Sequence, residues 1–171
     1  LIVVGGGPAG SSAARIAAEN GCTVALIEKE KEIAETVRTS GVTWISDIRR
    51  FGIPEDCYNP VKKFSFCSPK NSVVIEGEVA KAAVLDVRKT YRFVAERAEN
   101  SGSQIFVNTN VSKVLKDSNG NCTGVIAKSV EKQIRFNGKV IIDASGFASI
   151  VAKELGYVKQ WKKFGVGAEF E

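Results

Sequence analysis

The chain has 171 residues, of which 44% are hydrophobic and 25% charged, a balance typical of folded globular domains and not of disordered chains. This length allows one substantial core, or one domain and part of a second. No apolar stretch approaches the ~18–20 residues that a membrane span requires. The net charge of +5 is scattered, which favours a solvated surface and leaves a site for a polyanion or an acidic membrane as the alternative.

Histidine is absent, which excludes imidazole metal ligands and Ser-His or Cys-His nucleophiles. The four cysteines show no CxxC spacing and predict no metal site, although a bridge between Cys57 and Cys67 is conceivable. We therefore expect the chemistry of this chain to depend on a bound group. The absence of an initial Met and the apolar character of both ends suggest a piece of a longer protein.

The first 28 residues predict a strand, a glycine turn, a helix and a second strand. An apolar strand, residues 1–4, runs into glycines, and residues 11–20 have the apolar spacing of an amphipathic helix that ends at Gly21. Residues 23–27 form a second buried strand, which ends in Glu28.

The remaining chain is richer in strands. Residues 29–43 are polar and irregular, and residues 61–79 alternate like strands around a turn at Pro69. A strong hairpin turn at Asn119-Gly120 joins two strands. The other expected elements are helices at 43–51, Val87–Asn100 and 149–155 and strands at 104–107, 111–116, Cys122–Ser129 and 139–142.

This order predicts an α/β protein with a Rossmann-like fold of the glutathione-reductase type. A plain nicotinamide-binding domain would keep alternating strand and helix. A β-meander in the crossover position is instead typical of flavoproteins that bind two dinucleotides. We expect residues 1–58 and 81–156 to form a discontinuous FAD-binding domain, and 59–80 and 157–171 to be part of a β-rich substrate domain.

The pattern Gly5-x-Gly7-x-x-Gly10 carries the strongest chemical signal. The first glycine permits a tight turn, the second lets the backbone approach a pyrophosphate, and the third lets helix and strand pack closely. The N-terminus of the helix then offers free N–H groups to the phosphates. The candidate residues of this turn are Gly5, Gly7, Pro8, Ala9 and Gly10.

Glu28 follows the second strand, where a carboxylate accepts hydrogen bonds from both ribose hydroxyls and disfavours a 2′-phosphate. Its neighbour Lys29 is a further candidate, and an exposed acid that merely ends a strand is the alternative. Ala144, Ser145 and Gly146 follow the strand 139–142, and their small side chains would let a diphosphate chain pass. The alternative there is a strand-to-helix loop with Asp or Ser as the cap.

Ser40 and Gly41 lie in the irregular stretch, which is predicted to return over the middle of the cofactor, and a surface loop is the alternative. Arg88, at the start of a helix, is a candidate phosphate ligand, and a solvated position is equally compatible with its sequence context.

Together, these motifs resemble the geranylgeranyl reductase family of flavoproteins, part of the superfamily of p-hydroxybenzoate-hydroxylase-like enzymes. The resemblance spans nearly the whole chain and implies FAD as the cofactor, with NAD(P)H or ferredoxin as the electron donor. It places Ala9 and Gly10 at the pyrophosphate, Glu28 at the ribose and Val111 at the adenine. It also implies that Ser40 and Gly41 lie near the flavin and that Arg88, or Val87, contacts the cofactor. Many relatives have Cys-Gly where this chain has Ser40-Gly41.

The resemblance implies an FAD-dependent oxidoreductase that saturates isoprenoid double bonds of lipids by hydride transfer. An FAD-dependent monooxygenase and a non-catalytic dinucleotide-binding module are the alternatives. The expected partners are FAD and an isoprenoid or lipid, with no nucleic acid. The expected location is the cytoplasm, and a lipid substrate is compatible with peripheral membrane association. The sequence identifies no catalytic acid.

Overall fold

The computed structural model describes residues 1–130, 132–158 and 165, which form two compact units. The first unit holds Leu1–Thr36 and the described residues from Tyr91 onward, and the second holds Val37–Thr90. Helix α3, Val87–Asn100, begins in the second unit and continues in the first. The predicted domain boundaries, which include residues outside the described part of the chain, stay a prediction about the complete protein.

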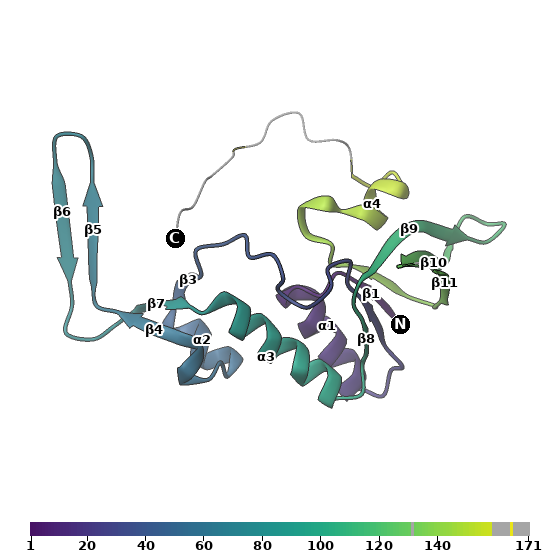
Figure 1. Ribbon diagram of the computed structural model, residues 1–171, viewed down its shortest axis with the longest axis horizontal. Coiled ribbons are helices and arrows are strands. Elements are labelled where there is room, and N and C mark those ends of the chain that lie inside the picture. The colour runs from purple at the N-terminus through teal and green to yellow at the C-terminus, as the bar shows by residue number, and fades with distance from the viewer. Residues whose placement is uncertain (131, 159–164, 166–171) are drawn as a thin grey trace. The chain divides into compact units, whose positions relative to one another are not determined.

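A four-stranded parallel sheet in the order β12-β1-β2-β8 is the centre of the first unit. Figure 1 labels two of its strands, β1 and β8. Helix α1 connects β1 to β2, and a three-stranded antiparallel sheet, β11-β10-β9, connects β8 to β12. The elements of this unit are β1 Ile2–Val4, α1 Pro8–Glu19, β2 Ala25–Ile27, β8 Gln104–Phe106, β9 Thr109–Lys116, β10 Cys122–Ser129, β11 Lys132–Asn137, β12 Ile141–Asp143, the 3₁₀ turn η2 Gly146–Ala148 and α4 Ile150–Glu154.

Alternation along the central strands separates two cores. Val3 of β1 and Leu26 of β2 pack with α1 and α3, whereas Ile2, Val4 and Ile27 pack with the antiparallel sheet and α4. Successive side chains of a strand point to opposite faces of its sheet, so each strand contributes to both cores. The result is three layers: the helices, the parallel sheet, and the antiparallel sheet β11-β10-β9, which is the meander. The predicted Rossmann-like fold with a β-meander crossover is confirmed.

A β-bulge in strand β9 decides which of its side chains lie on the buried face of the meander. Strand β9 shifts register against β10 at Ser112, so that Val111 pairs with Ala127 while Lys113 pairs with Ile126. A one-residue shift re-aims the side chains that follow it. Val111 and Val114 therefore both lie in the core, although strict alternation would place them on opposite faces.

The second unit is built on a three-stranded antiparallel sheet, β3-β7-β4, and a separate hairpin, β5-β6. Ile45, Ile48 and Ala83 form its small core. Its elements are β3 Val42–Trp44, α2 Ile45–Phe51, the 3₁₀ turn η1 Glu55–Cys57, β4 Tyr58–Val61, β5 Lys63–Cys67, β6 Ser72–Glu76 and β7 Ala82–Leu85.

The structure corrects several expectations. Helix α1 begins at Pro8, not at residue 11, because Gly7 serves as its N-cap and proline suits the first helical position. Thr43 is not helical, since it lies in a strand that pairs with β7. Strands β4, β7 and β11 were not anticipated. The conceivable bridge between Cys57 and Cys67 is absent: both thiols are free, Cys57 buried and Cys67 exposed.

Replacing Leu26, which is 0% exposed, by alanine tests the core on the helical side of the sheet. We expect the free energy of unfolding to fall by about 2–5 kcal/mol, because the change removes buried surface and leaves a cavity. Urea denaturation followed by circular dichroism measures this loss. The control Val73→Ala changes a side chain that is 59% exposed and should cost less than about 0.5 kcal/mol. Equal losses would contradict the assigned core.

Candidate cofactor-binding site

The glycine turn lies between β1 and α1, and two of its glycines are required by close backbone packing. Gly5 has a φ of +106°, and a Cβ atom there would lie 2.4 Å from the carbonyl oxygen of Ala144. A Cβ atom on Gly10 would lie 1.9 Å from the carbonyl oxygen of Gly5. Only glycine therefore allows α1 to begin so close to the end of β1.

Gly7 differs from these two glycines. A Cβ atom on it would meet no atom within 4 Å, and its φ of −69° suits any residue. No packing within the described residues explains a glycine at this position. A phosphate can approach the backbone closely only where no side chain stands in its way, and Gly7 meets this condition.

The N-terminus of α1 presents backbone N–H groups beside Gly7 that no capping side chain satisfies. Gly7 makes no side-chain capping hydrogen bond, Pro8 has no N–H, and the first turn contains no acidic residue. The N–H groups of the first helical turn have no partner inside the helix, so Ala9 and Gly10 present theirs at the positive end of the helix dipole. This donor set fits the diphosphate of a dinucleotide.

Glu28 is tied to the same turn. Its Oε2 accepts the N–H of Gly6 at 2.6 Å, and its Oε1 accepts the N–H of Glu30 at 2.9 Å. Its backbone is held as well, because Glu28 N–H donates to Phe106 and its carbonyl accepts from Thr109. The carboxylate is thus oriented, with lone pairs left for further donors. Lys29 is largely exposed and forms an ion pair with Glu30 at 3.3 Å.

The segment after β12 also reaches the turn. Ala144 N–H donates to the carbonyl of Val4 at 2.8 Å, and the Ala144 carbonyl lies against Gly5. The turn, Glu28 and residues 144–146 are therefore brought together, as expected for the carboxyl ends of neighbouring parallel strands. Gly146 has a φ of +63°, which favours glycine.

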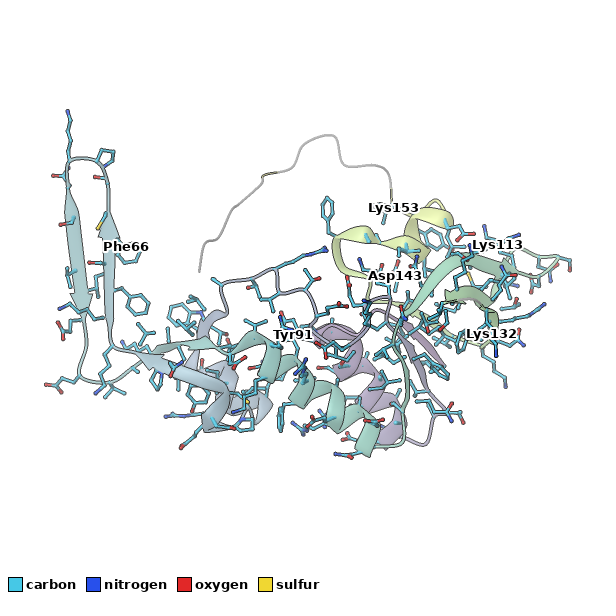
Figure 2. The ribbon with its side chains drawn as sticks, viewed as in Figure 1. Phe66, Tyr91, Lys113, Lys132, Asp143 and Lys153 are labelled. Atoms are coloured by element: carbon cyan, nitrogen blue, oxygen red, sulfur yellow. The ribbon has the colours of Figure 1, made fainter. Side chains whose placement is uncertain are left out.

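Asp143 and Ser145 have a structural role that the sequence left as the alternative. Asp143 Oδ1 accepts the hydroxyl and the N–H of Ser145, its Oδ2 accepts the N–H of Ala152 at 2.8 Å, and Ser145 Oγ accepts the N–H of Ile150 at 2.9 Å. The two side chains therefore cap the N-terminus of α4. In Figure 2, α4 lies above the labelled Asp143. Partial burial opposes ionisation of Asp143, but the hydrogen bonds from Ser145 and Ala152 prevail and hold its pKa below the usual value.

Other predicted site residues have other surroundings. Val111 is 5% exposed, and its side chain belongs to the core beneath the meander. Ser40, Gly41 and Arg88 belong to the second unit, in which Ser40 and Arg88 are exposed. Gly41 has a φ of +72°, and a Cβ atom there would lie 2.8 Å from the carbonyl oxygen of Leu85, so backbone packing requires this glycine.

Ser11 is a supporting residue that the sequence reasoning missed. Its side chain is wholly buried, and its hydroxyl donates to the carbonyl of Gly6 at 3.1 Å. A small polar residue directly after Gly10 was the only local signal for this contact. Ser11 thereby fixes the middle of the turn from inside the helix.

Neither a metal site nor a membrane-spanning helix is found among the described residues. Within the described ranges, no three His, Cys, Asp or Glu residues are placed to hold a metal ion. Among the helices of the same residues, none is long and apolar enough to cross a membrane.

The fold and the turn define a protein of the Rossmann-like, dinucleotide-binding class. Residues 1–154 match the model of the family described as FAD dependent oxidoreductase. The chain belongs to this family. FAD is the cofactor of the family, and the glycine turn, the uncapped helix terminus and Glu28 fit it.

Curated relatives support the resemblance to geranylgeranyl reductases. The chain is 32% identical over 160 residues to the digeranylgeranylglycerophospholipid reductase of Methanocaldococcus jannaschii, and 31% identical over 167 residues to reductase 1 of Methanosphaera stadtmanae. These matches cover 91% of this chain and 40% of each reductase. The chain therefore spans about two fifths of their length. It also covers 87% of a 31% identical, uncharacterized protein of Methanosarcina barkeri.

Solved structures agree in fold. A geranylgeranyl bacteriochlorophyll reductase-like protein from Thermoplasma acidophilum matches with a TM-score of 0.76 and 28% identity, over 85% of this chain and 38% of that one. The flavin-dependent brominase Bmp2 matches with a TM-score of 0.73 at 22% identity, over 91% of this chain and 41% of that one. The brominase likeness concerns the fold alone.

The Asp143 cap makes the stability depend on pH. Because the folded-state pKa is lowered, ionised Asp143 contributes stability above the unfolded value of about 3.9, and this contribution is lost as pH falls through the folded pKa. We expect Asp143→Asn to lower the free energy of unfolding at pH 7 by about 1 kcal/mol, since the group is partly exposed. The difference from wild type should shrink near pH 3.

Thermal denaturation at both pH values measures this effect. Glu78→Gln, which neutralises an exposed loop carboxylate, is the matched control and should change little at either pH. A deficit of Asp143→Asn that is the same at pH 3 and pH 7 would contradict the ionised cap.

Proposed function

We propose that this chain is the FAD-binding part of a reductase that saturates isoprenoid double bonds of lipids. The observation that carries the proposal is the identity of 32% over 91% of the chain to a protein named digeranylgeranylglycerophospholipid reductase. Identity to the brominase is 22%, and identity to a probable FAD-dependent monooxygenase from Pseudomonas aeruginosa that shares the fold is 14%. The reductases thus share more of the side chains, beyond the common fold.

In this proposal the glycine turn holds the diphosphate of FAD. The N–H groups of Ala9 and Gly10 donate to it, and Gly7 leaves room for its approach. Glu28, already oriented by Gly6, accepts from the hydroxyls of the adenosine ribose. Gly5 and Ala144 keep the backbone of the turn in place.

The finer assignments rest on the resemblance. Ser40 and Gly41 are proposed to lie near the flavin, and Arg88 to contact the cofactor. Val111 is proposed to contact the adenine through its backbone, since its side chain is in the core. Lys29, Pro8, Ser145 and Gly146 complete the proposed cofactor-binding set. The electron donor is proposed to be NAD(P)H or ferredoxin, and the substrate a geranylgeranyl lipid reached by peripheral membrane association.

FAD, once bound and reduced by the electron donor, would supply the hydride for an alkene carbon. The chain's own contribution is to bind the cofactor and fix its orientation. No residue is assigned as the donor of the proton for the second alkene carbon, because histidine is absent from this chain and the reductases are longer than the match.

Gly7→Ser tests the proposed diphosphate site. Serine is at least as good an N-cap as glycine, and Gly7 has an ordinary φ and open surroundings, so we expect an unchanged melting temperature. The new hydroxyl would occupy the helix N–H groups. Losing charge-assisted hydrogen bonds worth about 1.5–3 kcal/mol should weaken FAD binding roughly 10- to 150-fold. Titration of the complete apoprotein with FAD, followed by flavin fluorescence, measures the affinity.

Gly10→Ala is the contrasting control. Its Cβ atom would collide with the carbonyl of Gly5, so we expect loss of folding stability together with loss of FAD. A stable Gly7→Ser protein with wild-type FAD affinity would refute the proposed position of the diphosphate.

The substrate class is tested with the complete protein, reduced under anaerobic conditions. Addition of digeranylgeranylglycerophospholipid should restore the oxidised-flavin absorption at about 450 nm and yield a lipid of higher mass, by two units for each saturated bond. The fully saturated lipid is the control and should leave the flavin reduced. Oxygen-dependent hydroxylation of an aromatic compound, without reduction of the lipid, would instead favour the monooxygenase.

A further inference from the structure

The positive charge of the chain is concentrated in the meander. Residues 109–139 contain six Lys or Arg residues and two acidic residues, a net charge of +4 out of +5 for the whole chain. This segment forms β9, β10, β11 and their turns. The charge that looked scattered along the sequence is therefore gathered on one sheet.

Strand register places three of these cations on one face. Ile126 of β10 pairs with Lys113 on one side and with Arg135 on the other, so these three side chains form a row. Lys128, two residues along β10, points to the same face, opposite Asn110 and Gln133. The other face of the sheet is buried against the core, so the face bearing Lys113, Lys128 and Arg135 is the outward one.

This outward face contains no carboxylate among the described residues of the meander strands. Its remaining members are uncharged: Asn110, Leu115, Gly124, Ile126, Gln133 and Asn137. Arg135 donates to the neutral amide of Asn137 at 3.0 Å. The ion pairs between described side chains include neither Lys113 nor Lys128. Neighbouring like charges on a sheet repel, and an external anion relieves that repulsion.

Apolar groups accompany the cations. Leu115 and Ile126 are only partly buried on the outward face, and Val130, directly after β10, is 83% exposed. Figure 2 labels Lys113 on β9 and Lys132 at the start of β11. Cations interleaved with exposed aliphatic side chains suit a lipid surface, which offers anionic headgroups above an apolar layer. Among the described strand residues of the outward face, none is an aromatic side chain on which bases would stack.

We propose that the outward face of the meander docks the protein onto a membrane that contains anionic phospholipid. This inference rests on the proposed function, because a reductase of membrane lipids must reach them at the bilayer. It assigns that contact to Lys113, Lys128 and Arg135, with Val130 at the edge. Neither the glycine turn nor the hairpin β5-β6 takes part in this membrane contact.

The test is sedimentation of the complete, FAD-loaded protein with vesicles of phosphatidylcholine, with or without phosphatidylglycerol. Wild type should sediment with the anionic vesicles only, and added salt should release it. The triple variant Lys113→Gln, Lys128→Gln and Arg135→Gln should bind about 100-fold more weakly, at about fivefold for each cation. Its flavin absorption and its activity on detergent-dispersed lipid should be unchanged.

A charge-matched control separates this face from net charge. The variant Arg49→Gln, Lys62→Gln and Lys81→Gln removes three exposed cations of the second unit and should bind vesicles like wild type. A further variant, Phe66→Ser with Ile75→Ser, changes exposed residues of the hairpin and should also bind.

Three results would overturn the proposal: wild type that fails to sediment with anionic vesicles, undiminished binding of the meander variant, or equal losses in the control variants. Binding to duplex DNA in place of vesicles would assign the face to nucleic acid and overturn the membrane as its partner. Vesicle binding requires no catalysis, so its absence in a protein that reduces dispersed lipid leaves the proposed function intact. Vesicle binding without reduction of lipid would contradict the function and not the docking face.

Discussion

The close approach of α1 to the end of β1 is the constraint on which the candidate site depends. Gly10 lies against the carbonyl of Gly5, and Gly5 lies against the carbonyl of Ala144, at distances that leave no space for a side chain. This packing brings the first N–H groups of α1 beside Gly7, where the surroundings are open. Glu28 joins the same turn through the N–H of Gly6. Backbone packing, more than side-chain chemistry, therefore builds the candidate anion site.

The same central sheet explains why the meander can carry a second role. Strands β1 and β2 each supply a side chain to the helical core, Val3 and Leu26, and also side chains to the core beneath the meander. The meander replaces a crossover helix, and only its inner face is needed for packing. Its outer face is free of that constraint, and the net charge of the chain gathers in its strands and turns. Cofactor binding and the proposed membrane contact thus belong to separate layers of one unit.

Much of this fold was predictable because its signals are local. The glycine spacing, the helix Val87–Asn100 and the turn at Gly120 each follow from the conformational preferences of adjacent residues. Thr43 was misassigned to a helix because its partner, Ala83, lies 40 residues away and leaves no local trace. The roles of Asp143 and Ser145 were open for a similar reason, since their partner is a helix end several residues further along the chain.

The sequence by itself determined the class of candidate site: three glycines and an acid at the right spacing permit a turn, a helix terminus and a proposed ribose acceptor, and short-range sterics suffice for the turn. Only the tertiary structure decided which glycines are held by packing and which one leaves its surroundings open. It also decided that Lys113 faces outward while Val111 and Val114 face inward, because a bulge at Ser112 shifts the register of β9 against β10. Pairing between strands, which no single segment encodes, sets that register.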